Sequence, residues 1–279
     1  MTIVADKDVT MFEREAFELV RKTVTVLPQD VEEAIRKAAE KEKGTAKVQM
    51  GCILENIEIA KQNSIPLCQD TGWPIFFIFG KKMPDIDFES VVRKATKEAV
   101  IRPNMVDPLT RENTGDNTGA GAPFVNFVHC NTHYTDVWYM PKGLGSENMS
   151  RVAMLNPLDG WGRIKEFVLE TVRLAGGNAC PPIIIGLGIG GTMDHCALLA
   201  KKALLRRIDK PNGRERELLK EINALGIGPM GVGGKTTCLG VNMETAATHT
   251  GALPVAVNIQ CWCARRAGMR IEGGEVKWI

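Results

Sequence analysis

The 279-residue sequence lacks the features of several special protein classes. No apolar run approaches the ~18 residues that a membrane-spanning helix needs, and the first segment, MTIVADKDVTMFEREAFELV, has no apolar signal core. Lysine and arginine (35) exceed aspartate and glutamate (33) by only two, so the charge indicates no nucleic-acid or membrane surface. We therefore expect a cytoplasmic protein that binds neither nucleic acid nor membranes.

Cysteine pairs at C-x-x-C spacing are also missing, although the chain has eight cysteines. That spacing marks zinc ribbons and clustered-cysteine ferredoxins, so both classes are excluded. Stable disulfides are not expected either, because the cytoplasm is reducing and a chain of this size can form a sizeable core. Most of the cysteines are therefore interpreted as small buried hydrophobes, among them Cys52 and Cys196 on predicted helices.

The sequence predicts an α+β fold. The first 63 residues are expected to be helical, with Asp30 and Glu33 in the pattern of a capping box. A buried strand follows in IPLCQDTGWPIFFIFG, and two further strands, FVNFVHC and YTDVWYMP, are expected to meet at a turn. Beyond the helical N-terminal part, mixed sheets and helices follow without strict alternation. Because the chain shows no internal repeat and no obvious linker, we expect a single large domain over residues 1–279.

Two glycine-rich motifs look like nucleotide-binding loops but fit poorly. GLGIGG places Gly186, Gly188 and Gly191 in G-x-G-x-x-G spacing, yet Asp209, near the required distance, is in no predicted strand. PMGVGGKTT has Pro229 where a Walker A loop needs glycine, and it is interpreted as a tight glycine turn. An NAD-dependent dehydrogenase stays an alternative on the first motif alone.

Three cysteines share a polar setting at strand ends or in adjoining loops: Cys68 in CQD, Cys180 in NACPP and Cys261 in QCWCARR. Three widely separated thiolates suit a cubane iron–sulfur cluster in which one iron has no protein ligand and can act as a Lewis acid. A cluster with four thiolates would instead transfer electrons. Cys263 is the nearest spare thiol, so a non-catalytic redox or sensor protein is a further alternative.

Six motifs follow one another in a family order: CQDTG, RPNMVDPLTRENTGDN, KGLGSEN, NACPPIIIGLGIGGT, GIGPMGVGGKTTCLGVNMETAATHT and CWCARR. Through them nearly the whole chain resembles the alpha subunit of the class I, iron–sulfur fumarate hydratase and L-tartrate dehydratase family. The resemblance implies a hydro-lyase that adds water to, or removes it from, a four-carbon dicarboxylate. We expect a fumarate hydratase of the tricarboxylic acid cycle, with an L(+)-tartrate dehydratase as the alternative.

The resemblance also implies a 4Fe–4S cluster held by Cys68, Cys180 and Cys261, with its fourth iron open to the substrate. Gln69 and Asp70, next to the first ligand, are expected to line the substrate pocket. Proton transfer needs a group placed at the reacting carbon or the leaving hydroxyl, and Asp70 is the candidate for this role. The alternative, purely structural interpretation of Asp70 is an Asx turn before a Thr-Gly pair.

Cationic and backbone donors are expected around the substrate, because a dianion develops when a proton is removed beside a carboxylate. His249 is carried over as a catalytic residue at a carboxylate end of the substrate. Arg102 is the candidate for a bidentate carboxylate clamp, with Arg111 as the second choice. Gly143 and Gly145 of KGLGS would offer backbone NH groups.

A separate beta subunit is the last expectation. Single-chain relatives carry a second, C-terminal domain that contributes further basic and hydroxyl groups to the site. This chain ends at Ile279, soon after CWCARR. We therefore expect a hetero-oligomer in which the beta subunit completes the active site.

Overall fold

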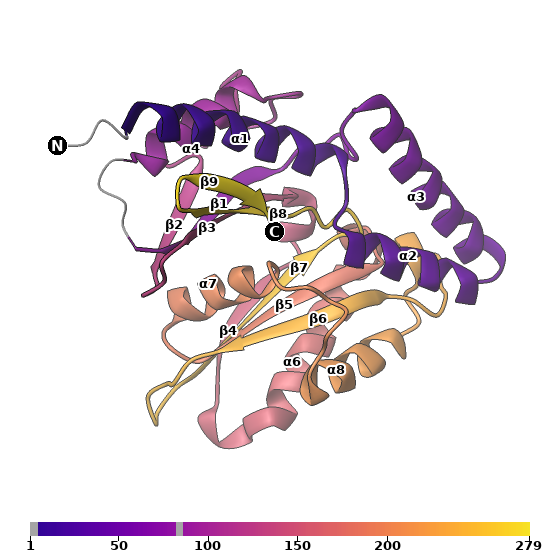
Figure 1. Cartoon of the computed structure of the whole chain (residues 1–279). Helices are drawn as coiled ribbons and strands as arrows, with labels where there is room; N and C mark the ends of the chain where they lie inside the picture. Colours follow the sequence, from indigo (N-terminus) through magenta and orange to yellow (C-terminus); the bar gives the residue numbers. More distant parts are fainter. Residues whose placement is uncertain (1–4, 82–85) are drawn as a thin grey trace. The chain divides into compact units, whose positions relative to one another are not determined.

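A computed structural model describes residues 5–81 and 86–279 (Figure 1), and the α+β prediction is confirmed. The chain falls into two compact units, each with its own sheet. Unit 1 comprises Met1–Pro28, Ile57–Lys142 and Arg265–Ile279, and unit 2 comprises Gln29–Asn56 and Gly143–Ala264. The single domain over residues 1–279 stays a prediction, because compactness of a unit does not test independent folding. Among the described helices, none combines the length and apolar character that crossing a bilayer requires.

Unit 1 is built on a five-stranded sheet with the order β2-β1-β3-β8-β9. Its elements are α1 (Ala5–Thr25), β1 (Trp73–Gly80), α4 (Phe88–Glu98), β2 (Phe124–His129), β3 (Thr135–Lys142), β8 (Ala267–Glu272) and β9 (Glu275–Trp278). The buried run of β1 packs with α1 and α4 through Phe12, Phe76 and Phe88. Asp87 is the N-cap residue of α4, and its carboxylate accepts a hydrogen bond from the Ser90 amide at 3.1 Å.

The predicted hairpin of β2 and β3 is wrong. Both segments are strands, but β1 lies between them, parallel to β2 and antiparallel to β3. The central position falls to β1 because its side chains are apolar on both faces, with Ile75, Phe76, Phe77 and Ile78 all buried. The more exposed β2 is left at the edge of the sheet.

Unit 2 is built on a four-stranded sheet with the order β4-β7-β5-β6. Its strands are β4 (Arg151–Leu155), β5 (Ile183–Ile189), β6 (Cys238–Thr245) and β7 (Leu253–Gln260). Its helices are α2 (Gln29–Lys41), α5 (Leu144–Glu147), α6 (Gly160–Ala175), α7 (Met193–Ala203) and α8 (Gly213–Asn223), with 3-10 turns η1 (Pro157–Asp159), η2 (Gly176–Ala179) and η3 (Pro229–Gly231). Helix α3 (Gly44–Asn63) contributes residues to both units. Strands β5 and β6 are parallel, whereas β7 is antiparallel to β4 and β5.

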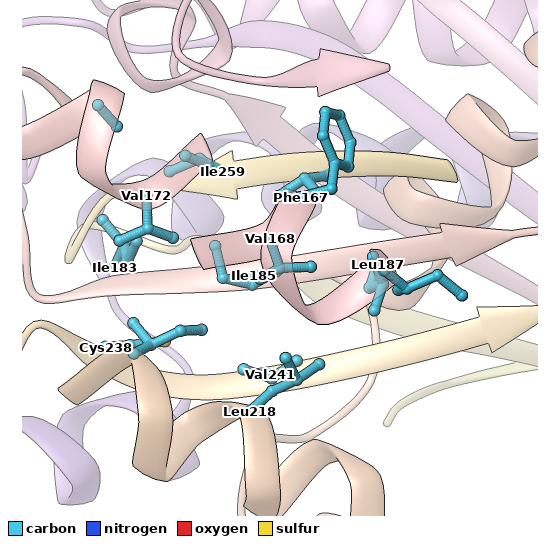
Figure 2. Close-up of a cluster of buried hydrophobic side chains, with 14 of the residues drawn as sticks. Phe167, Val168, Val172, Ile183, Ile185, Leu187, Leu218, Cys238, Val241 and Ile259 are labelled. Carbon is cyan, nitrogen blue, oxygen red and sulfur yellow. The ribbon is translucent and has the colours of Figure 1, made fainter. Parts of the chain in front are cut away.

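One face of this sheet carries the main core of unit 2. Figure 2 shows side chains from α6, α8 and the strands β5, β6 and β7 gathered into one apolar cluster. Its labelled members are Phe167, Val168, Val172, Ile183, Ile185, Leu187, Leu218, Cys238, Val241 and Ile259. Helix α6 ends at a pair of glycines, and Gly176 is its C-cap residue.

The opposite face of the sheet packs against α7, and this explains the GLGIGG motif. Gly186 and Gly188 lie inside β5 rather than in a loop. A Cβ atom at Gly188 would lie 1.9 Å from the Cys196 carbonyl oxygen, and one at Gly186 would lie 2.1 Å from that of Ala200. The two glycines therefore let the backbone of α7 touch the strand, a packing role that requires no dinucleotide.

The second glycine motif encloses an internal anion. The Glu42 carboxylate accepts hydrogen bonds from the Lys235 amide at 3.0 Å and from the Thr236 amide at 2.7 Å. Gly234 allows this approach, because a Cβ atom there would lie 2.8 Å from Oε2 of Glu42. The backbone donors that a phosphate loop would offer to a ligand are thus already occupied by a carboxylate of the chain.

Two local predictions near the N-terminus are wrong. Cys52 is exposed, because the buried stripe of α3 runs through Met50, Ile53 and Ile57 and leaves Cys52 on another side of the helix. Asp30 does not form the expected capping box, since α2 already begins at Gln29. The Asp30 carboxylate instead accepts a hydrogen bond from the Ile208 amide at 2.8 Å.

The packing of β5 against α7 makes a direct prediction for stability. We expect Gly188→Ala to lower the free energy of unfolding by about 3 kcal/mol, because the added methyl group must displace a helix backbone rather than a mobile side chain. Chemical denaturation of the purified chain measures the change. Gly213→Ala is the matched control: its Cβ atom meets nothing within 4 Å, and we expect a change within about 0.5 kcal/mol. Equal stability of both variants would contradict the close packing.

Candidate active site

In unit 1, the segment that leads into β1 holds three of the predicted site residues, Cys68, Gln69 and Asp70. The long loop after α4 fixes this segment. Nη1 of Arg102 donates to the Gln69 carbonyl at 2.9 Å, and the Thr71 hydroxyl donates to the Arg102 carbonyl at 2.8 Å. The structure therefore brings Arg102 together with the CQD segment, 33 residues away in sequence.

Asp70 forms the Asx turn that its sequence context allows. Its Oδ1 accepts hydrogen bonds from the Gly72 amide at 2.9 Å and from Nδ2 of Asn104 at 3.1 Å. Nη2 of Arg265, a residue only 1% exposed, donates to the Asp70 backbone carbonyl at 2.8 Å. These contacts fix the orientation of the carboxylate, so the turn and a role in a site are compatible.

The predicted loop residue Arg111 lies apart from this group. Val106 and Asn113 form an isolated β-bridge, and Arg111 lies within the turn that the bridge closes, with φ 66°. The base of the same loop is held by Asn117, whose side-chain oxygen accepts from the amides of Asn104 at 2.8 Å and Met105 at 3.2 Å. Of the two arginines considered as carboxylate clamps, the structure places only Arg102 beside Gln69.

In unit 2, two of the predicted cysteines meet at one end of the sheet. Cys180 directly follows η2 and precedes β5, and Cys261 directly follows β7. Because β5 and β7 are antiparallel neighbours, the start of one lies beside the end of the other. The Trp262 amide donates to the Cys180 carbonyl at 3.2 Å and closes the gap between the two loops. Cys180 itself has φ 50°, a conformation that residues with side chains seldom adopt and that is frequent at functional sites.

The KGLGSEN motif lies at the same end of unit 2. Its helix α5 contacts both β7 and η2, the elements that precede Cys261 and Cys180. Gly143 is the N-cap residue of α5, and a Cβ atom at Gly145 would meet nothing within 4 Å. Open space beside a glycine backbone suits the predicted binding of a ligand by main-chain NH groups.

Glu147, at the end of α5, anchors this motif. Its Oε1 pairs with Nζ of Lys201 on α7, and its Oε2 accepts a hydrogen bond from Nδ2 of Asn258 on β7 at 3.0 Å. Burial lowers the pKa of Lys201 from its ordinary value, although the adjacent Glu147 carboxylate opposes the shift.

The connection between β6 and β7 lies at the other end of the sheet of unit 2 (Figure 1). His249 is part of this connection. Nδ1 of this exposed histidine accepts a hydrogen bond from the Gly251 amide at 3.1 Å. The same connection is tied to the loop after β5, because the Gly191 amide donates to the Ala247 carbonyl at 3.1 Å. The eight residues of β7 span about seven steps of roughly 3.3 Å each, so His249 is on the order of 23 Å from Cys261 of its own unit. Unit 2 therefore does not bring His249 to its two cysteine loops.

The thiols differ in their fitness as metal ligands. Among the described residues, no group of three or more histidine, cysteine, aspartate or glutamate side chains is gathered around one metal position. The cysteines nevertheless fall into accessible and buried groups. Cys180 is exposed, and Cys68 and Cys261 are partly exposed, all three beside the ends of strands. Accessible loop thiols of this kind fit the ligand chemistry of an iron–sulfur cluster, which is bound by thiolates.

Three other cysteines are buried: Cys196, Cys238 and Cys263. Burial raises the pKa of Cys196 and raises that of Cys238 to about 12. Their sulfurs donate to the carbonyls of Met193 at 3.1 Å and Gly240 at 3.2 Å. These two thiols are structural, as the sequence predicted for Cys196.

Comparison with known proteins identifies the family. The family model described as fumarate hydratase (Fumerase) matches residues 13–270. A relative from Methanocaldococcus jannaschii, named putative L(+)-tartrate dehydratase subunit alpha, is 47% identical and covers 91% of this chain and 95% of its own. The L(+)-tartrate dehydratase subunit alpha of Escherichia coli K12 is 34% identical, covering 89% and 86%. A putative fumarate hydratase class I from Geobacillus stearothermophilus is 39% identical, but this chain spans only 56% of it.

The chain therefore belongs to the family of class I fumarate hydratases and L(+)-tartrate dehydratase alpha subunits, which are hydro-lyases. This family generally depends on iron–sulfur clusters. The resemblance stated from the motifs is confirmed, and the dehydrogenase alternative loses its basis because two of the three GLGIGG glycines serve helix packing.

Sequence reasoning missed several charged residues at these motifs. Lys142, at the end of β3, is completely buried, and Arg265 and Arg266 are 1% and 7% exposed. Glu147 was quoted within KGLGSEN but not singled out. The available signal was their position in the motifs: Lys142 is the first residue of KGLGSEN, and the two arginines end CWCARR. Charged residues are seldom buried without a specific partner.

The difference in exposure between the cysteines predicts their reactivity. In the metal-free chain at pH 8, an alkylating reagent should modify Cys68, Cys180 and Cys261 and leave Cys238 unmodified, because a thiol with a pKa of about 12 is ionised to only about one part in ten thousand. Peptide mass mapping over time measures each site, and denatured protein, in which all eight cysteines should react, is the control. Labelling of Cys238 as fast as Cys180 in the folded chain would contradict this difference.

Proposed function

We propose that this chain is the alpha subunit of a two-subunit iron–sulfur hydro-lyase that acts on a four-carbon dicarboxylate. The observation that supports it most is the convergence of three family motifs at one end of unit 2: the loops of Cys180 and Cys261 are joined by a backbone hydrogen bond, and α5 of KGLGSEN contacts both adjoining elements. In unit 1, the CQD segment and Arg102 form the corresponding group.

Cys68, Cys180 and Cys261 would hold a 4Fe–4S cluster. When bound, the cluster would supply a Lewis acid at the iron without a protein ligand, which polarises the hydroxyl that leaves or enters. The accessible loop positions of these three thiols support this ligand set, and the burial of Cys263 speaks against a fourth thiolate from that position.

The other groups of the site come from the chain's own polar residues. Asp70 would exchange a proton with the substrate, because its carboxylate is held in one orientation by the Gly72 amide and Asn104. Arg102 would bind a substrate carboxylate with the donors that its bond to the Gln69 carbonyl leaves over, and the Gln69 side chain would line the pocket. Backbone NH groups at Gly143 and Gly145 would bind the second carboxylate.

The substrate within this class is a choice between two diacids. The names of the relatives from M. jannaschii and E. coli give L(+)-tartrate more support than fumarate, which reverses the order expected from the motifs. The relative from G. stearothermophilus keeps fumarate as the second candidate. Both substrates are four-carbon diacids, and the extra hydroxyl of tartrate is the feature that a site must recognise to separate them.

A beta subunit would complete the site. The relatives that match over 86% and 95% of their own length are named alpha subunits, and a name of that kind implies a second chain. The longer relative from G. stearothermophilus has room for the missing part in the same chain. The cytoplasmic location expected from the sequence is part of this proposal.

The position of His249 leads to a proposal about the assembly. If His249 acts at a substrate carboxylate, it would not serve the cysteine loops of its own unit 2, because the eight residues of β7 lie between them. We propose that it enters the site of a second alpha chain, so that the assembly contains at least two alpha and two beta subunits.

Co-purification with the beta subunit tests the proposal. We expect the anaerobically purified complex to contain about four iron and four sulfide per alpha chain, and to dehydrate L(+)-tartrate with a higher kcat/KM than L-malate. The alpha chain alone should be nearly inactive. Iron and sulfide assays and steady-state kinetics measure these quantities.

Single substitutions supply the controls. Cys68→Ser, Cys180→Ser and Cys261→Ser should each lose the cluster, whereas Cys52→Ser, on an exposed helix position, should keep it. Retention of the cluster in all three variants would refute the ligand set, and full turnover by the cluster-loaded alpha chain alone would refute the need for a partner.

Mixing two inactive variants tests the position of His249. We expect His249→Ala and Cys261→Ser complexes to be inactive separately. If the subunits are unfolded and refolded together, the mixture should regain about a quarter of wild-type activity, because about half of the assemblies are mixed and each of these has one intact site of two. A mixture that stays inactive, although wild-type subunits recover under the same conditions, would show that His249 acts within its own chain or not at all.

A further inference from the structure

Unit 2 contains a partly buried ion pair that the proposed chemistry does not use. Lys201 projects from α7 with 20% of its side chain exposed, and Glu147, at the end of α5, is 30% exposed. The two are separated by 54 residues in sequence. Asn258 of β7 donates to the other oxygen of the same carboxylate at 3.0 Å. One carboxylate therefore joins three elements, α5, α7 and β7.

The contacts of Glu147 with Lys201 and Asn258 are important because α5 is too short to be stable by itself. A helix of four residues has too few internal hydrogen bonds to be stable alone. Its backbone is closed by the Glu147 amide, which donates to the Gly143 carbonyl at 3.2 Å, and by the Ser146 hydroxyl, which donates to the same carbonyl at 3.0 Å. The position of Gly143 thus follows that of Glu147, and Lys201 and Asn258 hold the Glu147 side chain.

A second contact ties the residues after α5 to the same strand. The Ile259 amide donates to the Ser150 hydroxyl at 3.0 Å, one residue beyond Asn258 and two before Cys261. The segment from Gly143 to Ser150 is therefore attached to the end of β7 at two adjacent positions. Any displacement of this segment moves the two glycine NH groups relative to the Cys261 loop.

Partial burial of the Lys201–Glu147 ion pair has a cost in desolvation energy. A partly buried lysine loses hydration, and the carboxylate compensates for that loss only in a fixed geometry. Apolar side chains would fill the space between α5 and α7 at no such cost. An ion pair with a third, directional hydrogen bond instead defines one position for the end of α5.

We propose that Lys201 is a positioning residue of the active site, which holds Glu147 and thereby keeps the backbone NH groups of Gly143 and Gly145 aimed at a substrate carboxylate. This inference rests on the proposed function, since it assigns those NH groups to a dicarboxylate. Lys201 touches no substrate in this scheme, and its effect passes through Glu147.

The experiment compares Lys201→Met and Lys201→Arg with wild type in the alpha–beta complex. Methionine keeps much of the apolar stem and removes the charge. We expect Lys201→Met to lower kcat/KM for the dicarboxylate by about tenfold to a hundredfold, chiefly through a higher KM, because small displacements of binding groups have effects of this size. Lys201→Arg, which keeps the ion pair, should recover most of the loss.

Lys165→Met is the matched control. Lys165 is 25% exposed and pairs with Glu217 at 2.8 Å and Glu221 at 2.9 Å, between α6 and α8 of the same unit. Lys165→Met should change the melting temperature about as much as Lys201→Met does, because partly exposed ion pairs of this kind contribute little to stability. It should leave KM within about twofold, because the Lys165 pairs lie away from α5. Equal KM values for the two methionine variants would overturn the proposal.

Hydrogen exchange supplies a readout that does not need turnover. In the alpha chain, peptides covering residues 143–150 should exchange faster in Lys201→Met than in wild type, while peptides of α6 should not. If the wild-type complex converted no dicarboxylate, the proposed function would fail, but hydrogen exchange would still test whether Lys201 holds residues 143–150 in place. Unchanged exchange in residues 143–150 would overturn the Lys201 inference.

Discussion

The antiparallel pairing of β5 with β7 is the constraint on which the candidate site of unit 2 depends. Cys180 precedes one strand and Cys261 follows the other, so the register of two neighbouring strands brings together residues more than eighty positions apart. The bond from the Trp262 amide to the Cys180 carbonyl then joins the loops themselves. Both strands are packed on a continuous apolar core (Figure 2), so the two loops that carry the thiols begin from well-packed elements.

In unit 1, the CQD segment is held in place by hydrogen bonds from arginine side chains to its backbone rather than by a pair of strands. The CQD segment has no ladder partner ahead of β1, and its carbonyls are instead bound by the guanidinium groups of Arg102 and Arg265. Two arginines that bind carbonyl oxygens add positive charge beside Asp70. Positive charge at this position would favour the dianionic substrate proposed above.

The sequence was informative where a local rule decides the outcome. The helices within the first 63 residues and the buried strand β1 follow from neighbouring residues, and both were predicted. Pairing between distant segments was not accessible: β1 separates β2 from β3, and the Glu147–Lys201 pair joins positions that no periodicity relates. The prediction that Cys52 is buried failed for a different reason. Helix α3 carries apolar residues on more than one side, and the side that faces the core cannot be identified without the elements that pack against the helix.

The bond between Glu42 and the GGKTT loop has a consequence for ligand competition. The loop is an anion receptor whose anion is attached to the same chain, and such an attached ligand acts at an effective concentration of at least the millimolar range. A free phosphate or nucleotide at cellular concentration would have to displace the Glu42 carboxylate from the Lys235 and Thr236 amides. The loop is therefore saturated from the moment the unit folds, and its glycines serve the architecture of the site rather than a cofactor.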